Sequence, residues 1–214
     1  MPRVEIAPGK YTDPETACMI REVQRKARHA VLIAQGSGST SVSASGQTHA
    51  GPGGVVDMRT VPLTRKQKMD QLIASRQVGF AAWIRPYVED LWGEHEHAVA
   101  IGSKYLSSAA EQQVQAYLHG RDGLAGNRKD PHAGLNIAPT TFKKYLAKQR
   151  GQATVLESTV GYAEPSLTAR KRKGTKRARG YRINYTRMVW ANGHLWIVTK
   201  LGTYYLSGKT TRGA

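Results

Sequence analysis

Cysteine is almost absent from this chain of 214 residues, in which Cys18 is the single example. One thiol excludes an intramolecular disulfide framework and any zinc module built from several cysteines. No run of apolar residues approaches the ~18 that a membrane-spanning helix needs. The N-terminal stretch MPRVEIAPGKYTDPET also lacks the apolar segment of a secretion signal. We therefore expect a chain with neither a signal peptide nor a transmembrane segment.

Acidic residues are scarce in the C-terminal third of the chain. Residues 142–214 contain 16 Lys and Arg but only two acidic residues, a balance of +14, whereas residues 1–141 contain 16 basic and 13 acidic residues, a balance of +3. A strongly cationic region joined to a nearly neutral one indicates two separate tasks, the second directed at a polyanion. Charge alone leaves nucleic acid, an anionic envelope polymer and anionic lipid open as that polyanion.

The distribution of apolar residues predicts two domains. The hydrophobic fraction of 40% is sufficient for a packed core. In residues 1–135, helical patterns and short apolar runs mix without a repeated strand–helix–strand unit, which predicts an α+β domain with a small mixed or antiparallel sheet. Residues 136–150 are predicted to form a linker with a short basic helix. Residues 151–214 contain five short strand patterns, which predict a small all-β barrel.

Capping patterns and apolar runs predict the elements of the first domain. Asp13, Pro14 and Glu15 are typical of a helix start, and Ser108 with Glu111 reads as a capping box. Helices are predicted over residues 14–30, over 65–76 after Thr64, and from 108 to a stop at Gly120. Strands are predicted at residues 30–34, 55–58, 78–84 and 96–101.

Histidines and carboxylates stand at positions suited to a metal site. His49 lies in a Gly/Ser-rich stretch, Gln35–Gly54, and a loop of that length inside a compact domain is often functional. Asp57 follows on an apolar strand pattern. His95 and His97 would point to the same face of their strand, because side chains repeat every two residues. Two histidines and a carboxylate form a usual catalytic zinc set with a position left for water.

Three patterns in this region, SxSGxTHxGxGGVVDM, GFAAWIR and HxHAVAIG, resemble the zinc D-alanyl-D-alanine carboxypeptidase and L-alanyl-D-glutamate endopeptidase family. That family is related in fold to the Hedgehog N-terminal domain and the lysostaphin-type peptidases, and it includes VanY-like carboxypeptidases and bacteriophage endolysins. The resemblance covers roughly residues 30–120 and implies that His49, Asp57 and His97 bind Zn²⁺. Seven residues separate His49 from Asp57, where the family usually has six, and Gln47 stands where many members have serine.

The resemblance implies a zinc metallopeptidase that hydrolyses an amide bond of the peptidoglycan stem peptide, at L-alanyl-D-glutamate or next to D-alanine. A zinc-bound water, its pKa lowered toward ~7, would attack after a base removes its proton. Family members use as base either a Glu three residues before the last ligand, here Glu94, or a His two residues before it, here His95. We prefer Glu94 as base and His95 as transition-state donor. Gln35 and Ser37, at the end of the strand before the site loop, are expected to contact substrate.

The C-terminal pattern WxNGHLWIVTKLGTYYLSGKTTRG resembles the SH3-like cell-wall-binding domains of endolysins. Trp190, Trp196 and Tyr204 are its candidate wall-binding residues, since aromatic rings stack on sugars and peptides. An insertion, Thr168–Arg182, contains eight Lys and Arg and would attract anionic wall polymers. The resemblance thus implies a monomeric phage endolysin for cell lysis, made in the host cytoplasm and acting on the wall after holin-type release.

Two other functions remain open from the sequence. The stretch KRKGTKRARGYR with neighbouring aromatic residues would suit nucleic-acid binding. No helix-turn-helix, zinc-finger or RNP pattern accompanies it, so we expect no specific nucleic acid as a partner. The third function is a wall-binding protein with a degenerate, metal-free site. Metal content separates the enzyme from both alternatives.

Overall fold

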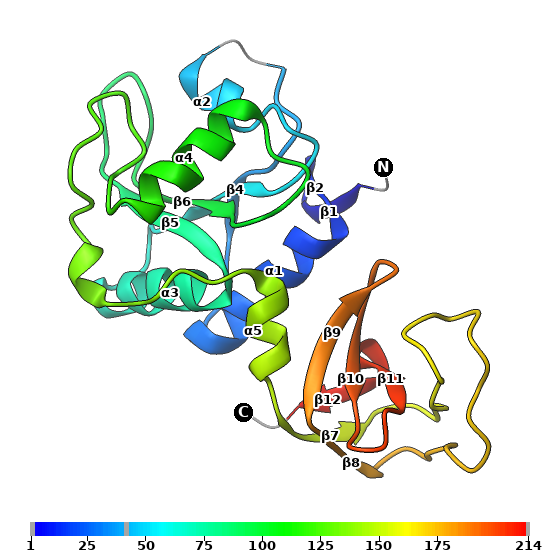
Figure 1. Ribbon diagram of the computed structural model, residues 1–214. Helices are drawn as coiled ribbons and strands as arrows, with labels where there is room; N and C mark the ends of the chain where they lie inside the picture. The colour runs from blue at the N-terminus through cyan, green and yellow to red at the C-terminus, as the bar shows by residue number, and fades with distance from the viewer. Residues whose placement is uncertain (1–2, 41–42, 213–214) are drawn as a thin grey trace. The chain divides into compact units, whose positions relative to one another are not determined.

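The computed structural model describes residues 3–40 and 43–212 of the chain (Figure 1). The chain divides into two compact units, Met1–Phe142 and Lys143–Ala214. This division falls inside the stretch that the sequence predicts to be a linker. Among the described residues, no helix combines the length and the apolar character needed to cross a bilayer.

A four-stranded sheet with strand order β3-β4-β6-β5 forms the centre of the first unit. Every neighbouring pair in it is antiparallel. The predictions of an α+β fold and of these strands are therefore confirmed, with bounds shifted by a few residues. The strands are β3 (Ile33–Gln35), β4 (Val55–Arg59), β5 (Phe80–Arg85) and β6 (His95–Ala100).

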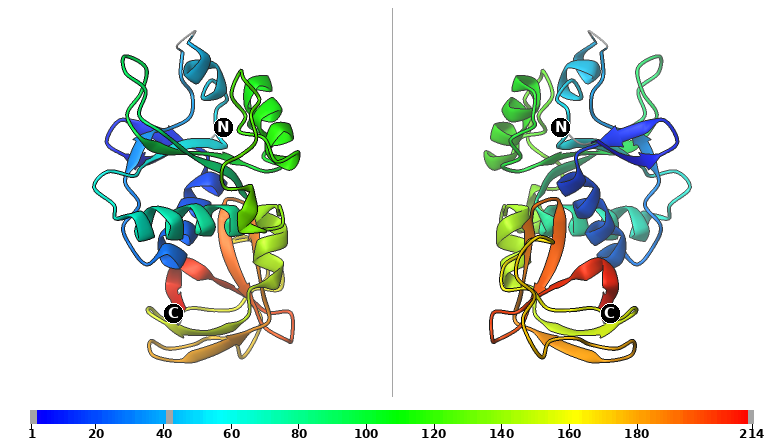
Figure 2. Two further views of the ribbon diagram at one scale, coloured as in Figure 1. Left: turned by 90° about the vertical axis from the view of Figure 1, so that its left-hand side faces the viewer. Right: turned by 90° about the vertical axis from the view of Figure 1, so that its right-hand side faces the viewer.

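Helices cover both faces of this sheet. Figures 1 and 2 show α1 and α3 on one side and α4 on the other. On the α4 side, Val55, Ala81, Trp83 and Val99 of the sheet pack against apolar residues of α4 in one buried cluster. The same side also carries the candidate site. The helices of this unit are α1 (Pro14–Ala27), α2 (Ala44–Thr48), α3 (Arg65–Val78) and α4 (Ser108–Leu118), with a 3-10 turn η1 (Ala133–Leu135).

Two of the predicted helix caps are confirmed and one is wrong. The Asp13 carboxylate accepts hydrogen bonds from the backbone N–H groups at the start of α1, and Thr64 forms a capping box with Gln67 on α3. For α4, however, Ser107 and not Ser108 is the N-cap, because its hydroxyl accepts a hydrogen bond from the Ala110 N–H at 3.2 Å. The N-cap therefore lies one residue earlier than the capping-box pattern indicated, while the helix itself starts at the predicted Ser108.

The long Gly/Ser-rich stretch is less irregular than the sequence indicated, because α2 forms inside it. The hairpin of β1 (Val4–Ala7) and β2 (Lys10–Thr12) lies against it, and Ser37 N–H donates to the Tyr11 carbonyl at 2.8 Å. Glycine is needed where the chain packs most closely. A Cβ on Gly51 would lie 2.3 Å from the Tyr105 carbonyl oxygen, and one on Gly53 would lie 2.3 Å from an Asp13 carboxylate oxygen.

The second unit begins with the rest of α5 (Phe142–Lys148) and contains two separate three-stranded antiparallel sheets, β11-β10-β9 and β12-β7-β8. Asn192 and Gly193 form the predicted hairpin turn, with φ values of 51° and 74° that suit a type I′ turn. The described strands do not form one closed barrel. The strands are β7 (Gly151–Val155), β8 (Arg182–Tyr185), β9 (Arg187–Ala191), β10 (His194–Val198), β11 (Tyr204–Leu206) and β12 (Thr210–Arg212), with a 3-10 turn η2 (Ser207–Lys209).

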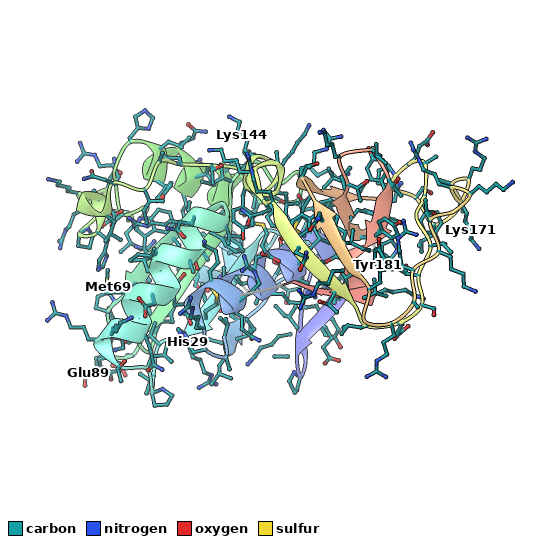
Figure 3. The ribbon with its side chains drawn as sticks, turned by 90° about the horizontal axis from the view of Figure 1, so that it is seen from below. His29, Met69, Glu89, Lys144, Lys171 and Tyr181 are labelled. Atoms are coloured by element: carbon teal, nitrogen blue, oxygen red, sulfur yellow. The ribbon has the colours of Figure 1, made fainter. Side chains whose placement is uncertain are left out.

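The long loop between β7 and β8, which we call the basic loop, contains the cationic insertion. Isolated bridges pair Thr159 with Arg177 and Tyr162 with Lys171, so the loop has a defined path. Figure 3 labels Lys171 and Tyr181 on it, and Lys171 extends away from the ribbon. Six of its cationic side chains are exposed, as expected for clustered like charges: Arg170, Lys171, Arg172, Lys173, Lys176 and Arg179.

Candidate metal centre

Strand pairing brings Asp57 and His97 together. Asp57 of β4 lies directly opposite His97 of β6 in the antiparallel register. Side chains of directly opposed residues project from the same face with Cβ atoms ~5 Å apart. The His97 Nδ1 atom lies 2.7 Å from Asp57 Oδ1, and both side chains are buried. Two of the three predicted metal ligands are thus placed by rigid strands.

His49 joins them from the end of α2. It is the C-cap of that helix, and its carbonyl accepts hydrogen bonds from Gly38 and Ser39, which hold the preceding loop against it. Its side chain is fully buried, with Nε2 located 3.3 Å from Asp57 Oδ2. The interval of seven residues before Asp57 is accommodated because Gly54 adopts a φ of +85°, a conformation that favours glycine.

In His49 and in His97, the ring nitrogen farther from Asp57 forms a hydrogen bond that fixes the tautomer. The other nitrogen therefore faces Asp57 with a lone pair. His49 Nδ1–H donates to the Gly36 carbonyl at 2.8 Å, so Nε2 is the free nitrogen. His97 Nε2 lies 2.7 Å from Gln113 Oε1, and Gln113 Nε2 donates to the Gly123 carbonyl, which fixes the orientation of the amide. His97 therefore carries its proton on Nε2 and directs Nδ1 at Asp57. Metal-binding histidines commonly have this outer support.

Three electron-pair donors consequently converge: His49 Nε2, His97 Nδ1 and a carboxylate oxygen of Asp57, all within 4.8 Å of one another. Among the described residues, the buried His49 Nε2 has no hydrogen-bond partner. Lone pairs that face one another in a buried site repel unless a cation lies between them. The group could therefore hold a metal ion, and two imidazoles with one carboxylate are a donor set that suits zinc.

The pKa values of Asp57 and His97 agree with this arrangement, and that of His49 shifts the other way. Burial would raise the pKa of Asp57, but the neighbouring His97 and His49 hold it well below its usual range, so Asp57 is ionised. Burial lowers the pKa of His97 more than Asp57 raises it, which favours the neutral ring that a metal needs. Burial also lowers the pKa of His49, but the Asp57 carboxylate 3.3 Å from its Nε2 outweighs burial and raises it, so this ring competes for a proton as well as for a metal ion.

His95 is the third histidine at the cluster. Its Nδ1–H donates to the Gly93 carbonyl at 2.7 Å, which leaves Nε2 without a proton. That Nε2 lies 3.8 Å from Asp57 Oδ1. The predicted orientation of His95 and His97 to the same face of β6 is confirmed by their shared contact with Asp57. His95 thus places the Nε2 atom of its ring beside the three donors.

Glu94, our preferred base, lines the same cavity as the cluster, but its described hydrogen bonds go to residues outside the cluster and do not support this preference. Its carboxylate accepts hydrogen bonds from Thr60 Oγ1 at 2.7 Å and from Lys68 Nζ of α3. Those hydrogen bonds hold the pKa of Glu94 below its usual value. Strand alternation explains the position, because a face that carries His95 and His97 cannot also carry the residues before and between them. Glu96 likewise points toward α3, where it accepts a hydrogen bond from Gln71.

A cavity of about 1050 Å³ opens beside the cluster. Gln35, a predicted substrate residue, lines it. Ser37 does not fit that prediction, because it is buried and its hydroxyl donates to the Val55 carbonyl at 2.7 Å, which joins two segments of backbone. The lining also includes Gln47, Arg85, Trp92, Gln112 and Arg121, together with Asp57, His95 and His97.

Sequence reasoning missed two residues that support the cluster. Gln113 orients His97, as described above. Trp83, the register partner of His97 on β5, stacks beside its ring with centroids 6.2 Å apart and donates from Nε1 to the Arg121 carbonyl. The strand pattern GFAAWIR contained Trp83, but only strand order shows which strand lies next to β6. No sequence signal indicated Gln113, because its role depends on where α4 packs.

In the second unit, one of the predicted wall-binding residues is inaccessible. Trp196 is fully buried, and its Nε1 donates to the Ala191 carbonyl at 3.1 Å, so it is a core residue. It lies on β10, the central strand of its sheet, where one face is covered. Trp190 and Tyr204 are half-buried and retain exposed surface.

Comparison with known proteins finds no relative of this chain. No protein-family model matches the chain, and neither the curated proteins nor the solved structures contain a significant match. Function therefore has to be inferred from the side chains of the site.

Proposed function

We propose that this chain is a zinc-dependent peptidoglycan peptidase of the endolysin type, which hydrolyses an amide bond in the stem peptide. The observation that carries the proposal is the buried group of His49, Asp57 and His97 at the wall of an open cavity, with the free Nε2 of His95 3.8 Å from Asp57. Three protein ligands with an accessible fourth position are typical of catalytic zinc, whereas structural zinc sites are closed.

Each residue has a defined task in this reaction. A zinc ion held by His49 Nε2, Asp57 and His97 Nδ1 would supply Lewis-acid activation of a water and of the scissile carbonyl. His95 Nε2 accepts the proton of the attacking water and later donates it to the leaving amine. Its Nδ1–H remains bonded to the Gly93 carbonyl, which keeps the ring in the required tautomer. The Gly36 carbonyl and the Gln113 side chain likewise fix the tautomers of the two imidazole ligands, His49 and His97.

We further propose that the second unit is an SH3-like wall-binding domain. Its support is the basic loop, whose Lys and Arg outnumber its two acidic residues, Glu157 and Glu164, and are mostly exposed to solvent. A cationic surface of this kind attracts anionic polymers over a distance of several ångströms and does so less at high salt. Trp190 and Tyr204 are the aromatic residues left to contact the wall.

The decisive experiment combines metal analysis with the products released from purified bacterial walls. We expect about one zinc per chain, loss of turbidity of the wall suspension, and abolition of this loss by a chelator and by His97→Ala. His29→Gln is the matched control, because His29 bonds to Gln71 of α3 and lies outside the cluster. Mass spectrometry of the released muropeptides identifies the bond from its new termini.

Two results would contradict the proposal. A protein that binds walls but contains no metal would be the degenerate binding module. A protein that shifts DNA at physiological salt and leaves walls intact would be a nucleic-acid-binding protein that uses the basic loop.

A further inference from the structure

Arg85 is a buried cation in the wall of the cavity. It is the last residue of β5 and lies directly opposite His95 of β6. Both residues line the cavity, and their side chains leave the sheet on the same face with Cβ atoms ~5 Å apart. Arg85 is only 5% exposed, yet in the described part of the chain its Nη2 has no hydrogen-bond partner.

A comparison with Arg76 shows how unusual this is. Arg76 is equally buried, but its guanidinium donates to the Asp130 carboxylate at 2.6 Å and to the carbonyls of Ala82 and His132. Arg85 forms no ion pair with any carboxylate among the described residues; it lies over the Trp83 ring, with its central carbon 4.8 Å from the ring centroid. The ring orients the guanidinium but satisfies none of its N–H groups.

The carboxylates near Arg85 have other partners. Asp122 accepts hydrogen bonds from the backbone of Leu124 and Arg128, and Asp57 belongs to the metal centre. Burial lowers the pKa of Arg85 to about 10, and Asp122 and Asp57 oppose this shift, so Arg85 remains cationic at neutral pH. A buried cation without a hydrogen-bonded anion is costly. The missing partner is therefore expected to come from a ligand.

The rest of the cavity also favours an anion. Its lining contains two further arginines, Arg59 and Arg121, both exposed. Its two carboxylates are Asp57, in the metal centre, and Glu94, bonded to Lys68.

We propose that Arg85 binds a carboxylate of the substrate, so that the enzyme selects peptides with a free carboxylate within one residue of the scissile amide. The inference rests on the function proposed above and specifies its substrate class. A guanidinium matches a carboxylate with two parallel hydrogen bonds, which also fixes the direction of the peptide. Because one residue of peptide spans ~3.5 Å, a carboxylate held by Arg85 places the neighbouring amide next to His95.

Two carboxylates of a stem peptide satisfy this chemistry: the α-carboxylate of a γ-linked D-glutamate and the C-terminal carboxylate of D-alanine. We would test them with two matched peptide pairs and the zinc-loaded full chain. The first pair is L-alanyl-γ-D-glutamyl-L-lysine and its D-glutamyl α-carboxamide. The second is a stem pentapeptide that ends in D-alanyl-D-alanine and its C-terminal carboxamide.

For the pair that contains the cleaved bond, we expect kcat/KM to be ~10²-fold higher for the carboxylate than for the carboxamide. Arg85→Gln should reduce this ratio to about 1, mainly through a higher KM for the carboxylate. Arg21→Gln is the matched control, because Arg21 is an exposed arginine of α1 that does not line the cavity, and it should keep the ratio. Equal kcat/KM values within both pairs, or an unchanged ratio in Arg85→Gln, would overturn the inference and leave the peptidase intact.

A binding measurement separates this inference from the proposed function. Titration calorimetry of the same peptides against the full chain should show tighter binding of the carboxylate form, lost in Arg85→Gln, even if no peptide is hydrolysed. That combination would retain the role of Arg85 and reject the peptidase. If Arg85→Gln does not fold, Arg85→Lys replaces it, with an expected tenfold rise in KM for the carboxylate alone; an equal rise for both peptides would overturn the inference.

Discussion

The two faces of the central sheet each bury a carboxylate, in opposite electrostatic surroundings. On the cavity face, Asp57 lies between His49 and His97, and these imidazoles hold its pKa far below the usual range although burial acts in the other direction. On the face covered by α3, burial raises the pKa of Glu96 to about 7. Glu96 accepts a hydrogen bond from Gln71, while its Oε1 has no partner among the described residues.

The neighbours of each buried carboxylate determine its role. His49 and His97 keep Asp57 ionised although it is buried, so its carboxylate is available as a metal ligand. Among the described residues no cation forms an ion pair with Glu96, and the hydrogen bonds and the Arg76 charge near it only partly offset its desolvation, so its ionisation weakens the fold. Both residues lie on the paired strands β4 and β6, and only the side of the sheet distinguishes them. Substitutions of matched residues on the two faces test this difference.

The largest effect is expected from Asp57→Asn, which removes the charge from the cavity face without changing the shape of the side chain. Bound zinc should fall from about one ion per chain to near zero, because the carboxylate is the only anion among the three donors. Glu96→Gln, the same exchange on the opposite face, should keep its zinc. Metal analysis after dialysis measures both. Stoichiometric zinc in Asp57→Asn would show that the three donors are not the binding site.

The next effect compares the two candidate bases, of which His95 lies 3.8 Å from Asp57 and Glu94 pairs with Lys68. His95→Ala should lower kcat by ~10²–10⁴-fold, because the general base is lost, while the zinc content stays at that of the wild type. Glu94→Gln should change kcat by less than about threefold, because Glu94 bonds to Lys68 and Thr60 away from the cluster. Hydrolysis of wall fragments gives both values. The reverse order of effects would return the role of base to Glu94.

The pH dependence of stability should come largely from the α3 face. The carboxyl of Glu96 titrates near 4.5 when unfolded and near 7 when folded. Because the folded state binds the proton more tightly, the contribution of Glu96 to stability is greatest below about pH 4.5 and falls as pH rises toward 7, by about 3 kcal/mol. Glu96→Gln should remove this loss and be more stable than wild type at pH 8.

Chemical unfolding at pH 5 and pH 8 measures the effect, with the exposed Glu111→Gln as control. An equal change of stability with pH in Glu96→Gln and in Glu111→Gln would assign the pH dependence to other groups.

The smallest effect concerns the outer support of the metal centre. Gln113→Ala removes the acceptor that holds the His97 Nε2–H, and loss of such a contact commonly weakens metal binding by ~10–100-fold. Gln112→Ala, the neighbouring exposed residue of α4, is the control and should bind zinc as tightly as wild type. Competition with a chromogenic chelator measures both affinities. Equal affinity in the two variants would show that Gln113 does not orient His97.

Much of the candidate site could be predicted from local patterns. Alternation on one strand placed His95 and His97 together, and the same alternation excluded Glu94 from their face, an inference that was available from the sequence. Which side chains are buried could not be predicted from these local patterns. Ser37 was expected to meet substrate and Trp196 a wall ligand, but backbone pairing and strand position bury both.

The sequence by itself determined the elements with short-range causes: the caps of α1 and α3, the alternation of β6, and the Asn192-Gly193 turn. These depend on residues a few positions apart. Tertiary structure decided the site, because its contacts join residues distant along the chain: His97 to Asp57 across 40 positions, His97 to Gln113 across 16 and His49 to Gly36 across 13. Strand register and helix packing create these contacts, since each requires the whole sheet to be assembled before two side chains can meet.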